Sequence, residues 1–270
     1  MNRLQERFDS LAAAQRKFVL PYITAGYPDV GATIELLEQL DHDHIGAVEL
    51  GIPFSDPIAD GPVIQTSFYR ALESGYTNRK LFDALAKRRA EIAVPLIAMV
   101  SYSIVARRGC ESFVEAAVAA GIDGFIVPDL SLEEASEFAT ICCDRKATFA
   151  MLVAPNTSTA RRERIAALST PFVYYQAVAG ITGERAALPD DLVTNIESLR
   201  GSAKKPVCVG FGIAKPEQAR EVCRVADGVI VGSAIVRRMN ESVERGDSEG
   251  RMIDGVTRFV NELADAVGMG

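Results

Sequence analysis

Eight short apolar segments recur along the chain, and each is followed by a turn and a longer amphipathic stretch. They lie at 19–24, 47–52, 95–100, 124–128, 148–153, 172–177, 206–211 and 228–232. Valine, isoleucine and phenylalanine are frequent in them, as expected of strands that are covered on both faces. Eight such strands alternating with helices predict an α/β protein with the (β/α)8 TIM-barrel fold, as a single domain over 1–270. An open, doubly wound sheet is the alternative, because the pattern does not establish closure.

Two features extend this basic pattern. An amphipathic segment at 4–14 precedes the first strand, and we expect it to form an extra N-terminal helix that covers the bottom of the barrel. The connections after the second and the sixth strands are long. We expect an extra helix and a functional loop in the first. In the second, at 180–190, we expect a lid that closes over a substrate and excludes water.

Composition limits the classes of protein to which the chain can belong. Its 36 acidic and 29 basic residues give a net charge of −7, which argues against a nucleic-acid binder. The longest uncharged stretch, 165–183, holds serine, threonine, proline, glutamine and glycine, so we do not expect a membrane helix there. Five cysteines without metal-type spacing, and no apolar leader, favour reduced thiols in a cytoplasmic protein.

The second apolar segment contains a single acid, Glu49, and two more carboxylates, Asp56 and Asp60, follow it in a proline-bearing loop. Alternation along a strand places Ala47, Glu49 and Gly51 on one face, where small neighbours leave room for a ligand. Burying an ionised carboxylate away from water is energetically costly unless a cation pairs with it, so a buried acid has either an ion-pair partner or a functional role. We interpret Glu49 as functional, the alternative being a buried acid held by an arginine or lysine. The two aspartates could also be turn or helix-start residues.

Glycine-rich turns follow the last three strands, at 180–183, 210–212 and 232–234. Glycine allows backbone N–H groups to approach an anion closely, and the N-terminus of a following helix adds a partial positive charge. The loops after the seventh and eighth strands are the usual phosphate site of this fold. The three turns therefore predict a phosphate monoester site, and ordinary strand-to-helix turns are the alternative.

Other types of chemistry lack the residues that they need. The two histidines, His42 and His44, precede the second strand, at the end of the barrel opposite the expected site, and we expect a solvated loop there rather than a metal centre. Lys215 lies beside a helix-starting proline, which disfavours a Schiff-base aldolase. No glycine-rich dinucleotide motif follows the first strand. The sequence therefore predicts carboxylate acid–base chemistry on a phosphorylated substrate, without a metal or cofactor.

Five stretches of the chain carry a resemblance to a known family: PYITAGYPD at 21–29, VELGIPFSDPIADGPVIQ at 48–65, GITG at 180–183, VCVGFGIAKPEQ at 207–218 and DGVIVGSAIV at 227–236. Through them the chain resembles the tryptophan synthase α subunit family over nearly its full length. The resemblance implies a barrel that cleaves indole-3-glycerol phosphate to indole and glyceraldehyde 3-phosphate. It also implies an α2β2 complex with a β subunit that holds pyridoxal phosphate, receives indole through a tunnel and joins it to serine.

The resemblance assigns the site residue by residue. Glu49 matches the acid–base group and Asp60 the second carboxylate, which accepts the indole N–H. The positions that match substrate contacts are Tyr22, Tyr102, Tyr174 and Thr182. Those that match the phosphate cradle are Gly183, Phe211, Gly212, Gly232 and Ser233. The double role of Glu49 in proton transfer requires that burial raise its pKa toward neutrality.

Three positions depart from the family pattern without touching the two carboxylates. Gly46 stands where the family commonly has aspartate, Ile104 where an asparagine-containing loop faces the β subunit, and Ala177 where a small hydroxyl residue is frequent. They concern coupling to the β subunit and closure of the lid. Two other functions remain open: a stand-alone indole-releasing lyase, and a non-catalytic phosphate-binding regulator of a β subunit.

Overall fold

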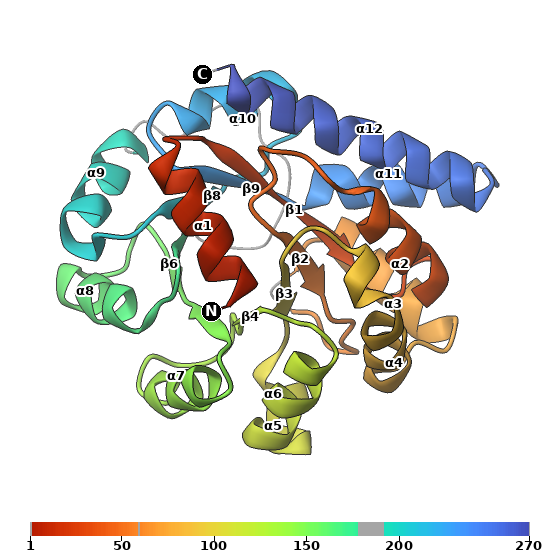
Figure 1. The fold of residues 1–270 in the computed structure, drawn as a ribbon, viewed down its shortest axis with the longest axis horizontal. Coiled ribbons are helices and arrows are strands. Elements are labelled where there is room, and N and C mark those ends of the chain that lie inside the picture. Colours follow the sequence, from red (N-terminus) through yellow and green to blue (C-terminus); the bar gives the residue numbers. More distant parts are fainter. Residues whose placement is uncertain (1, 59, 178–191, 270) are drawn as a thin grey trace.

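The computed structural model describes residues 2–58, 60–177 and 192–269 (Figure 1). Within them, nine parallel strands form one sheet in the order β5-β4-β3-β2-β1-β9-β8-β7-β6. Their bounds are β1 Phe18–Thr24, β2 Val48–Gly51, β3 Leu96–Met99, β4 Gly124–Ile126, β5 Thr148–Ala150, β6 Leu152–Val153, β7 Val173–Gln176, β8 Val207–Gly210 and β9 Gly228–Val231. These strands coincide with the eight predicted segments, of which the fifth is divided in two.

The sheet closes on itself through that divided segment. β5 and β6 are separated only by Met151, yet they stand at the two ends of the strand order, β5 paired with β4 and β6 with β7. At Met151 the backbone N–H donates to the Ser169 hydroxyl at 3.1 Å, while its carbonyl accepts from the backbone of Tyr174 at 3.2 Å. The strand thus changes neighbours at this residue. The predicted (β/α)8 barrel is confirmed, and the open, doubly wound alternative is wrong.

Helices surround the barrel, and the apolar side chains between them and the strands form the larger core (Figure 1). Their bounds are α1 Arg3–Ala13, α2 Val30–Gln39, α3 Pro62–Glu73, α4 Asn78–Arg88, α5 Tyr102–Arg108, α6 Cys110–Ala119, α7 Ala135–Asp144, α8 Thr159–Leu168, α9 Leu192–Ala203, α10 Pro216–Cys223, α11 Ser233–Glu244 and α12 Glu249–Gly268, with a 3-10 turn at Arg89–Glu91. In β2, Val48 and Leu50 belong to this outer core, whereas Ala47, which directly precedes β2, belongs to the inner one, as the alternation predicts.

The expected extra N-terminal helix is present as α1, which lies across the end of the barrel where the strands begin (Figure 1). Its buried face, Leu4, Phe8 and Leu11, belongs to the same cluster as the inward-facing residues of the strands. Asn2 caps the helix and also donates to the backbone carbonyls of Asp123 at 2.8 Å and Lys146 at 2.7 Å. The helix therefore covers the bottom of the barrel, and backbone N–H groups of its first turn donate to the Asn2 side chain.

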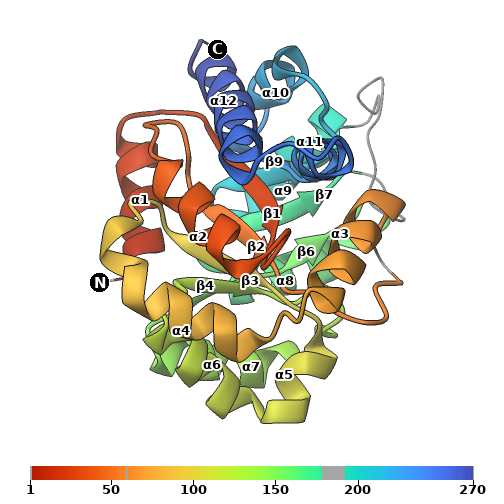
Figure 2. The same cartoon turned by 90° about the vertical axis from the view of Figure 1, so that its right-hand side faces the viewer.

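At the opposite end, the long connection after β2 holds the expected extra helix. Both α3 and α4 lie between β2 and β3, and α3 begins with Pro62 at its first position, where the missing N–H costs no hydrogen bond. Figure 2 shows α3 beside α11 at the carboxyl ends of the strands, and Ile64 and Phe68 of α3 cluster there with Val236 of α11 and Tyr22 of β1. This cluster flanks the barrel mouth.

Candidate active site

Glu49 lies in the middle of β2, and its side chain is 0% exposed. Within the described part of the chain, neither of its carboxylate oxygens has a hydrogen-bond partner. Burial raises the pKa of Glu49 to about 8, because water no longer solvates the ionised form. Glu49 therefore carries a proton at neutral pH and can both give it up and take it back, which is the property that general acid–base chemistry requires.

Asp60 lies in the loop between β2 and α3, and two hydrogen bonds from the Gln65 side chain hold this loop closed. Gln65 donates to the backbone carbonyls of Pro57 at 3.1 Å and Asp60 at 2.7 Å. Partial burial raises the pKa of Asp60 to about 6, so its carboxylate stays largely ionised at neutral pH. Asp56 is exposed, accepts a hydrogen bond from Ser55 at 3.1 Å, and stands in the turn. The two aspartates thus differ in environment.

Two tyrosines lean across neighbouring strands at the level of these acids. A side chain at Gly51 would place its Cβ 1.8 Å from the Tyr22 hydroxyl oxygen, and one at Gly210 would place it 2.5 Å from that of Tyr174. Glycine is therefore what makes room for each ring. Burial raises the pKa of both tyrosines, and the charges of Glu49 and Asp60 raise it further. The four groups share one electrostatic environment inside the mouth.

The expected phosphate side of the mouth is formed by the ends of β8 and β9. Gly212 has a φ of 64°, in the left-handed region that favours glycine, while the Phe211 side chain is buried in the outer core, which leaves its backbone for the mouth. Gly232 and Ser233 begin α11, and the first N–H groups of a helix have no partner within it. The Tyr22 ring lies 3.5 Å from a Cβ built at Gly232, so this end adjoins the acids.

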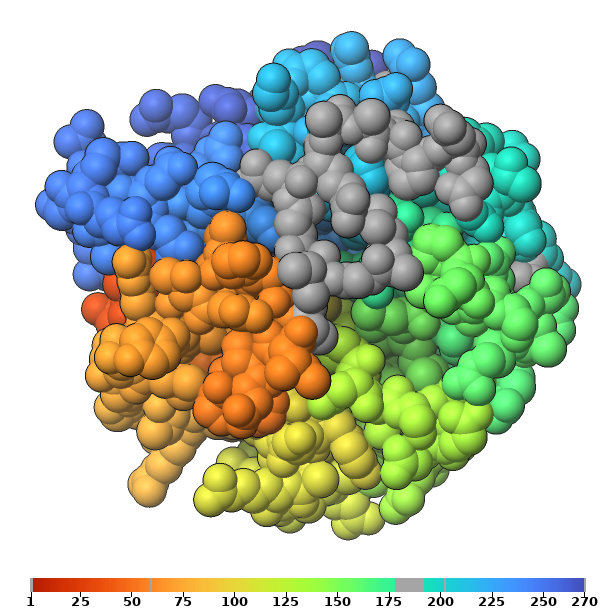
Figure 3. Space-filling model, turned by 180° about the vertical axis from the view of Figure 1, so that it is seen from behind, coloured from red at the N-terminus to blue at the C-terminus, as the bar shows by residue number. Residues whose placement is uncertain are grey.

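Not every predicted residue joins this group. Tyr102 begins α5, where its backbone N–H donates to Asp129 at 2.7 Å, and its hydroxyl faces the Cys110 thiol, which raises its pKa. It does not share the environment of Glu49. Thr182 and Gly183, together with the predicted lid at 180–190, lie outside the described residues. Figure 3 shows the mouth face with α3 in orange and α11 in blue beside the centre.

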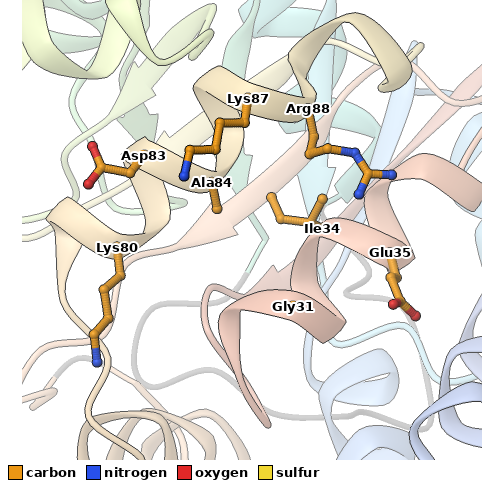
Figure 4. Close-up of a pocket in the computed structure, with 8 residues that line it drawn as sticks. All are labelled: Gly31, Ile34, Glu35, Lys80, Asp83, Ala84, Lys87 and Arg88. Carbon is orange, nitrogen blue, oxygen red and sulfur yellow. The ribbon is translucent and has the colours of Figure 1, made fainter.

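Residues outside the mouth account for the remaining sequence features. His42 contacts Asp265 at 3.1 Å and His44 contacts the carbonyl of Lys17 at 2.7 Å, at the end of the barrel opposite the acids. Among the residues that the structure describes, no group of three or more His, Cys, Asp or Glu is placed to hold a metal ion. A groove of about 490 Å³ lies in the outer layer between α2 and α4 (Figure 4), lined by Gly31, Ile34, Glu35, Lys80, Asp83, Ala84, Lys87 and Arg88. The side chains that line this groove carry both positive and negative charges, and the groove lies away from the barrel mouth.

Comparisons with known proteins give a consistent family. A family profile described as "Tryptophan synthase alpha chain" matches residues 8–267. The tryptophan synthase alpha chain of Rhodopirellula baltica is 45% identical over 269 residues, covering 98% of this chain and 96% of the relative. That of Chloroflexus aurantiacus is 40% identical over 268 residues, covering 99% of each.

Solved structures agree in both fold and sequence. A structure of Mycobacterium tuberculosis tryptophan synthase superposes with a TM-score of 0.87 at 30% identity, covering 100% of this chain and 99% of the other. Tryptophan synthase subunit alpha from Legionella pneumophila gives a TM-score of 0.86 at 31% identity, covering 99% and 98%. The chain belongs to the tryptophan synthase alpha chain family.

Proposed function

We propose that Glu49 and Asp60 carry the cleavage of indole-3-glycerol phosphate to indole and glyceraldehyde 3-phosphate, the carbon–carbon lyase reaction of the family. The observation that supports this assignment is a buried Glu49 with a raised pKa and no hydrogen-bond partner among the described residues, together with a largely ionised Asp60 whose charge, like that of Glu49, acts on Tyr22 and Tyr174. Two carboxyl groups whose environments give them different charges at one pH can divide acid and base roles between them.

The reaction follows from these two charge states. Protonated Glu49 donates its proton to C3 of the indole ring, and the ring becomes a cation that withdraws electrons from the bond to the glycerol chain. Asp60 accepts a hydrogen bond from the ring N–H and stabilises that positive charge. Ionised Glu49 then takes the proton of the adjacent glycerol hydroxyl. The carbon–carbon bond breaks, its electron pair returns to the ring, and an aldehyde forms, so Glu49 ends protonated as it began.

The substrate phosphate is proposed to bind at the ends of β8 and β9. Backbone groups at Phe211 and Gly212, and the start of α11 at Gly232 and Ser233, supply N–H donors and the positive end of a helix dipole. The proposed contacts from Thr182 and Gly183 would come from the lid. Tyr22 and Tyr174 flank the indole ring in this arrangement, and Tyr102 is proposed as an outer contact.

The partner is proposed to be a tryptophan synthase β subunit, which holds pyridoxal phosphate, in an α2β2 complex. Two large apolar side chains are exposed beside the mouth: Ile58, 88% exposed in the loop before Asp60, and Tyr69, 64% exposed on α3. A groove of about 710 Å³ runs between this loop and α3. Exposed apolar surface of this kind is typical of an interaction site, and it supports docking of the β subunit at this end.

Two further proposals concern the chain as a whole. No helix in the described ranges is long and apolar enough to span a membrane. All five cysteines are free thiols, and this supports a reducing, cytoplasmic location. We also propose that residues 1–270 form one domain, because a single barrel sheet organises the described elements.

The experiment that tests this function is an indole-release assay on indole-3-glycerol phosphate, with and without an added β subunit. We expect weak release by the chain alone and a large gain with the β subunit. High release alone that the β subunit leaves unchanged would instead identify a stand-alone lyase. Stimulation of the β subunit together with full activity in Glu49→Gln would identify a non-catalytic regulator.

A further inference from the structure

The loop between β2 and α3 is tied to the helix at the residue that carries the second acid. The Gln65 side chain donates to the backbone carbonyl of Asp60 at 2.7 Å and to that of Pro57 at 3.1 Å. The backbone N–H of Asp60 donates to the same Pro57 carbonyl at 3.1 Å. These three hydrogen bonds form a closed ring, which we call the Gln65 clasp, and both polar backbone groups of Asp60 belong to it.

A primary amide suits this position because its nitrogen carries two N–H donors in one plane. Both partners of the Gln65 side chain are carbonyl oxygens, so the amide nitrogen and not the amide oxygen has to face them. The backbone N–H of Gln65 in turn donates to the Gly61 carbonyl at 3.0 Å, where α3 begins. The clasp therefore joins the loop to a helix.

The part of the loop before Asp60 has a different environment. The backbone N–H of Ile58 donates locally, to the carbonyl of Asp56 at 2.8 Å, and the Ile58 side chain is 88% exposed, so packing does not anchor it. Asp60 itself is partly buried, and its charge acts on Tyr22 and Tyr174 inside the mouth. The clasp therefore fixes an otherwise exposed loop at its reactive acid.

We propose that Gln65 is a positioning residue that holds the Asp60 carboxylate where it meets the N–H of the indole ring. Because the N–H and the carbonyl of Asp60 are both held, the backbone of this residue cannot turn freely, and the direction of its side chain is set. Stabilisation of a ring cation depends on such fixed geometry, since a misplacement of about 1 Å can cost roughly 10²-fold in rate.

The proposal rests on the proposed function, in which Asp60 accepts the indole N–H and stabilises the ring cation. Gln65 is exposed in the groove beside α3 and acts through the backbone of Asp60. It therefore adds to the two carboxylates a residue whose role is to place one of them.

The main test is kcat for indole release at saturating indole-3-glycerol phosphate and β subunit. Gln65→Met keeps the approximate length of the side chain but removes both donors, so the loop is free to turn at Asp60. We expect kcat to fall roughly tenfold, less than in Asp60→Asn, because a misplaced carboxylate still carries its charge. Competition by glycerol phosphate should stay unchanged, since the phosphate side of the mouth lies outside the clasp.

Thr66→Val is the matched control. Thr66 follows Gln65 on α3, lines the same groove and donates to the Pro62 carbonyl at 2.8 Å, within the helix and not to the loop. Loss of this hydrogen bond should leave kcat unchanged. In an Asp60→Asn background, Gln65→Met should cause little further loss, because the charge that it positions is already absent. The same tenfold loss in that background would overturn the positioning role.

A second readout does not depend on turnover. Hydrogen exchange of peptides that contain the Asp60 N–H, measured on the full chain, should be faster in Gln65→Met than in wild type and unchanged in Thr66→Val. If folded Gln65→Met keeps the wild-type kcat, the proposal fails, whether exchange is faster or not. Failure of the proposed function has a different signature, namely indole release that neither Asp60→Asn nor Glu49→Gln reduces.

Discussion

The two ends of the barrel treat their polar groups in opposite ways. At the bottom, polar side chains find partners: Arg7 donates to the carbonyls of His42 and Ile45, and Arg89 pairs with Asp123 at 2.8 Å. At the mouth, Glu49 is more deeply buried than these groups but has no hydrogen-bond partner within the described residues. The first arrangement stabilises the fold, whereas the second keeps a group ready for reaction at a cost in stability.

The packing of aromatic side chains also differs between the two ends of the barrel. At the bottom, Phe8 of α1 packs on Phe18 and Phe172 with ring centroids 4.8 and 5.2 Å apart, which fills the end of the barrel. At the mouth, the rings of Tyr22 and Tyr174 lean sideways over glycines. The bottom is thus a closed core, and the mouth keeps aromatic surface available for a flat ligand.

Replacement of Glu49, whose carboxylate has no hydrogen-bond partner among the described residues, should produce the largest effect. Glu49→Gln keeps the shape of the side chain but can neither donate nor accept the transferred proton, so indole release should fall by roughly 10²–10⁴-fold. The measurement is kcat in the complex with a β subunit. Near-normal turnover would place the acid–base group elsewhere and remove the contrast between the two ends.

A cavity at the bottom of the barrel should have a comparably large effect, but on stability rather than on activity. Phe8→Ala leaves a cavity between α1 and the barrel and should lower the free energy of unfolding by about 3–5 kcal/mol. Urea denaturation measures this loss, and kcat well below the melting temperature should remain within about twofold of wild type. A proportional loss of kcat would show that the two ends are not independent.

The pH dependence of stability sharpens the comparison further. Below pH 4.5 Glu49 is protonated whether the chain is folded or unfolded; between its ordinary pKa of 4.5 and its folded pKa of about 8, only the unfolded chain ionises. Rising pH therefore favours unfolding, on the order of 3 kcal/mol by pH 7. Glu49→Gln should remove this slope, so its stability relative to wild type should rise between pH 5 and pH 7.5 in urea titrations. Parallel curves would contradict it.

The second acid should show a smaller effect, confined to turnover. Asp60→Asn keeps a hydrogen-bond acceptor for the indole N–H but loses the charge that stabilises the ring cation, so kcat should fall by roughly 10²-fold. Binding of glycerol phosphate, measured by competition, should stay unchanged because the phosphate side of the mouth is intact. Equal losses in both measurements would show that Asp60 holds the loop rather than the cation.

Much of the fold could be predicted because strands and helices leave periodic patterns. The alternation around Glu49 and the covering helix α1 are local properties of the sequence, and the structure has both. The division of the fifth strand at Met151 was not predictable, because it depends on which strands become its neighbours on each side.

The site could be predicted only in part, for a similar reason. Glu49 and Asp60 were found from the residues themselves. The roles of Gly51 and Gly210 depend on rings that reach over them from adjacent strands. Tyr102 was assigned by resemblance, and the placement of α5 turns its hydroxyl toward Cys110.

Gly46, a residue predicted to depart from the family pattern, lies against the Phe18 ring. A Cβ at this position would lie 2.6 Å from the Phe18 ring, and one at Gly228 would lie 2.4 Å from it. The ring therefore occupies the space that an aspartate at position 46 would need. A Gly46→Asp substitution requires a smaller residue at position 18.

The leaning tyrosines have a consequence for how such a mouth can change during evolution. Because the Tyr22 hydroxyl occupies the place of a side chain at Gly51, the two positions share one volume, and Gly51 cannot gain a side chain while Tyr22 keeps its place. The same holds for Tyr174 and Gly210. Each pair lies on two different strands, so a change in ligand size would have to arise through simultaneous substitutions that are distant in the gene. The space between the Tyr22 and Tyr174 rings is therefore determined by two pairs of residues, Tyr22 with Gly51 and Tyr174 with Gly210.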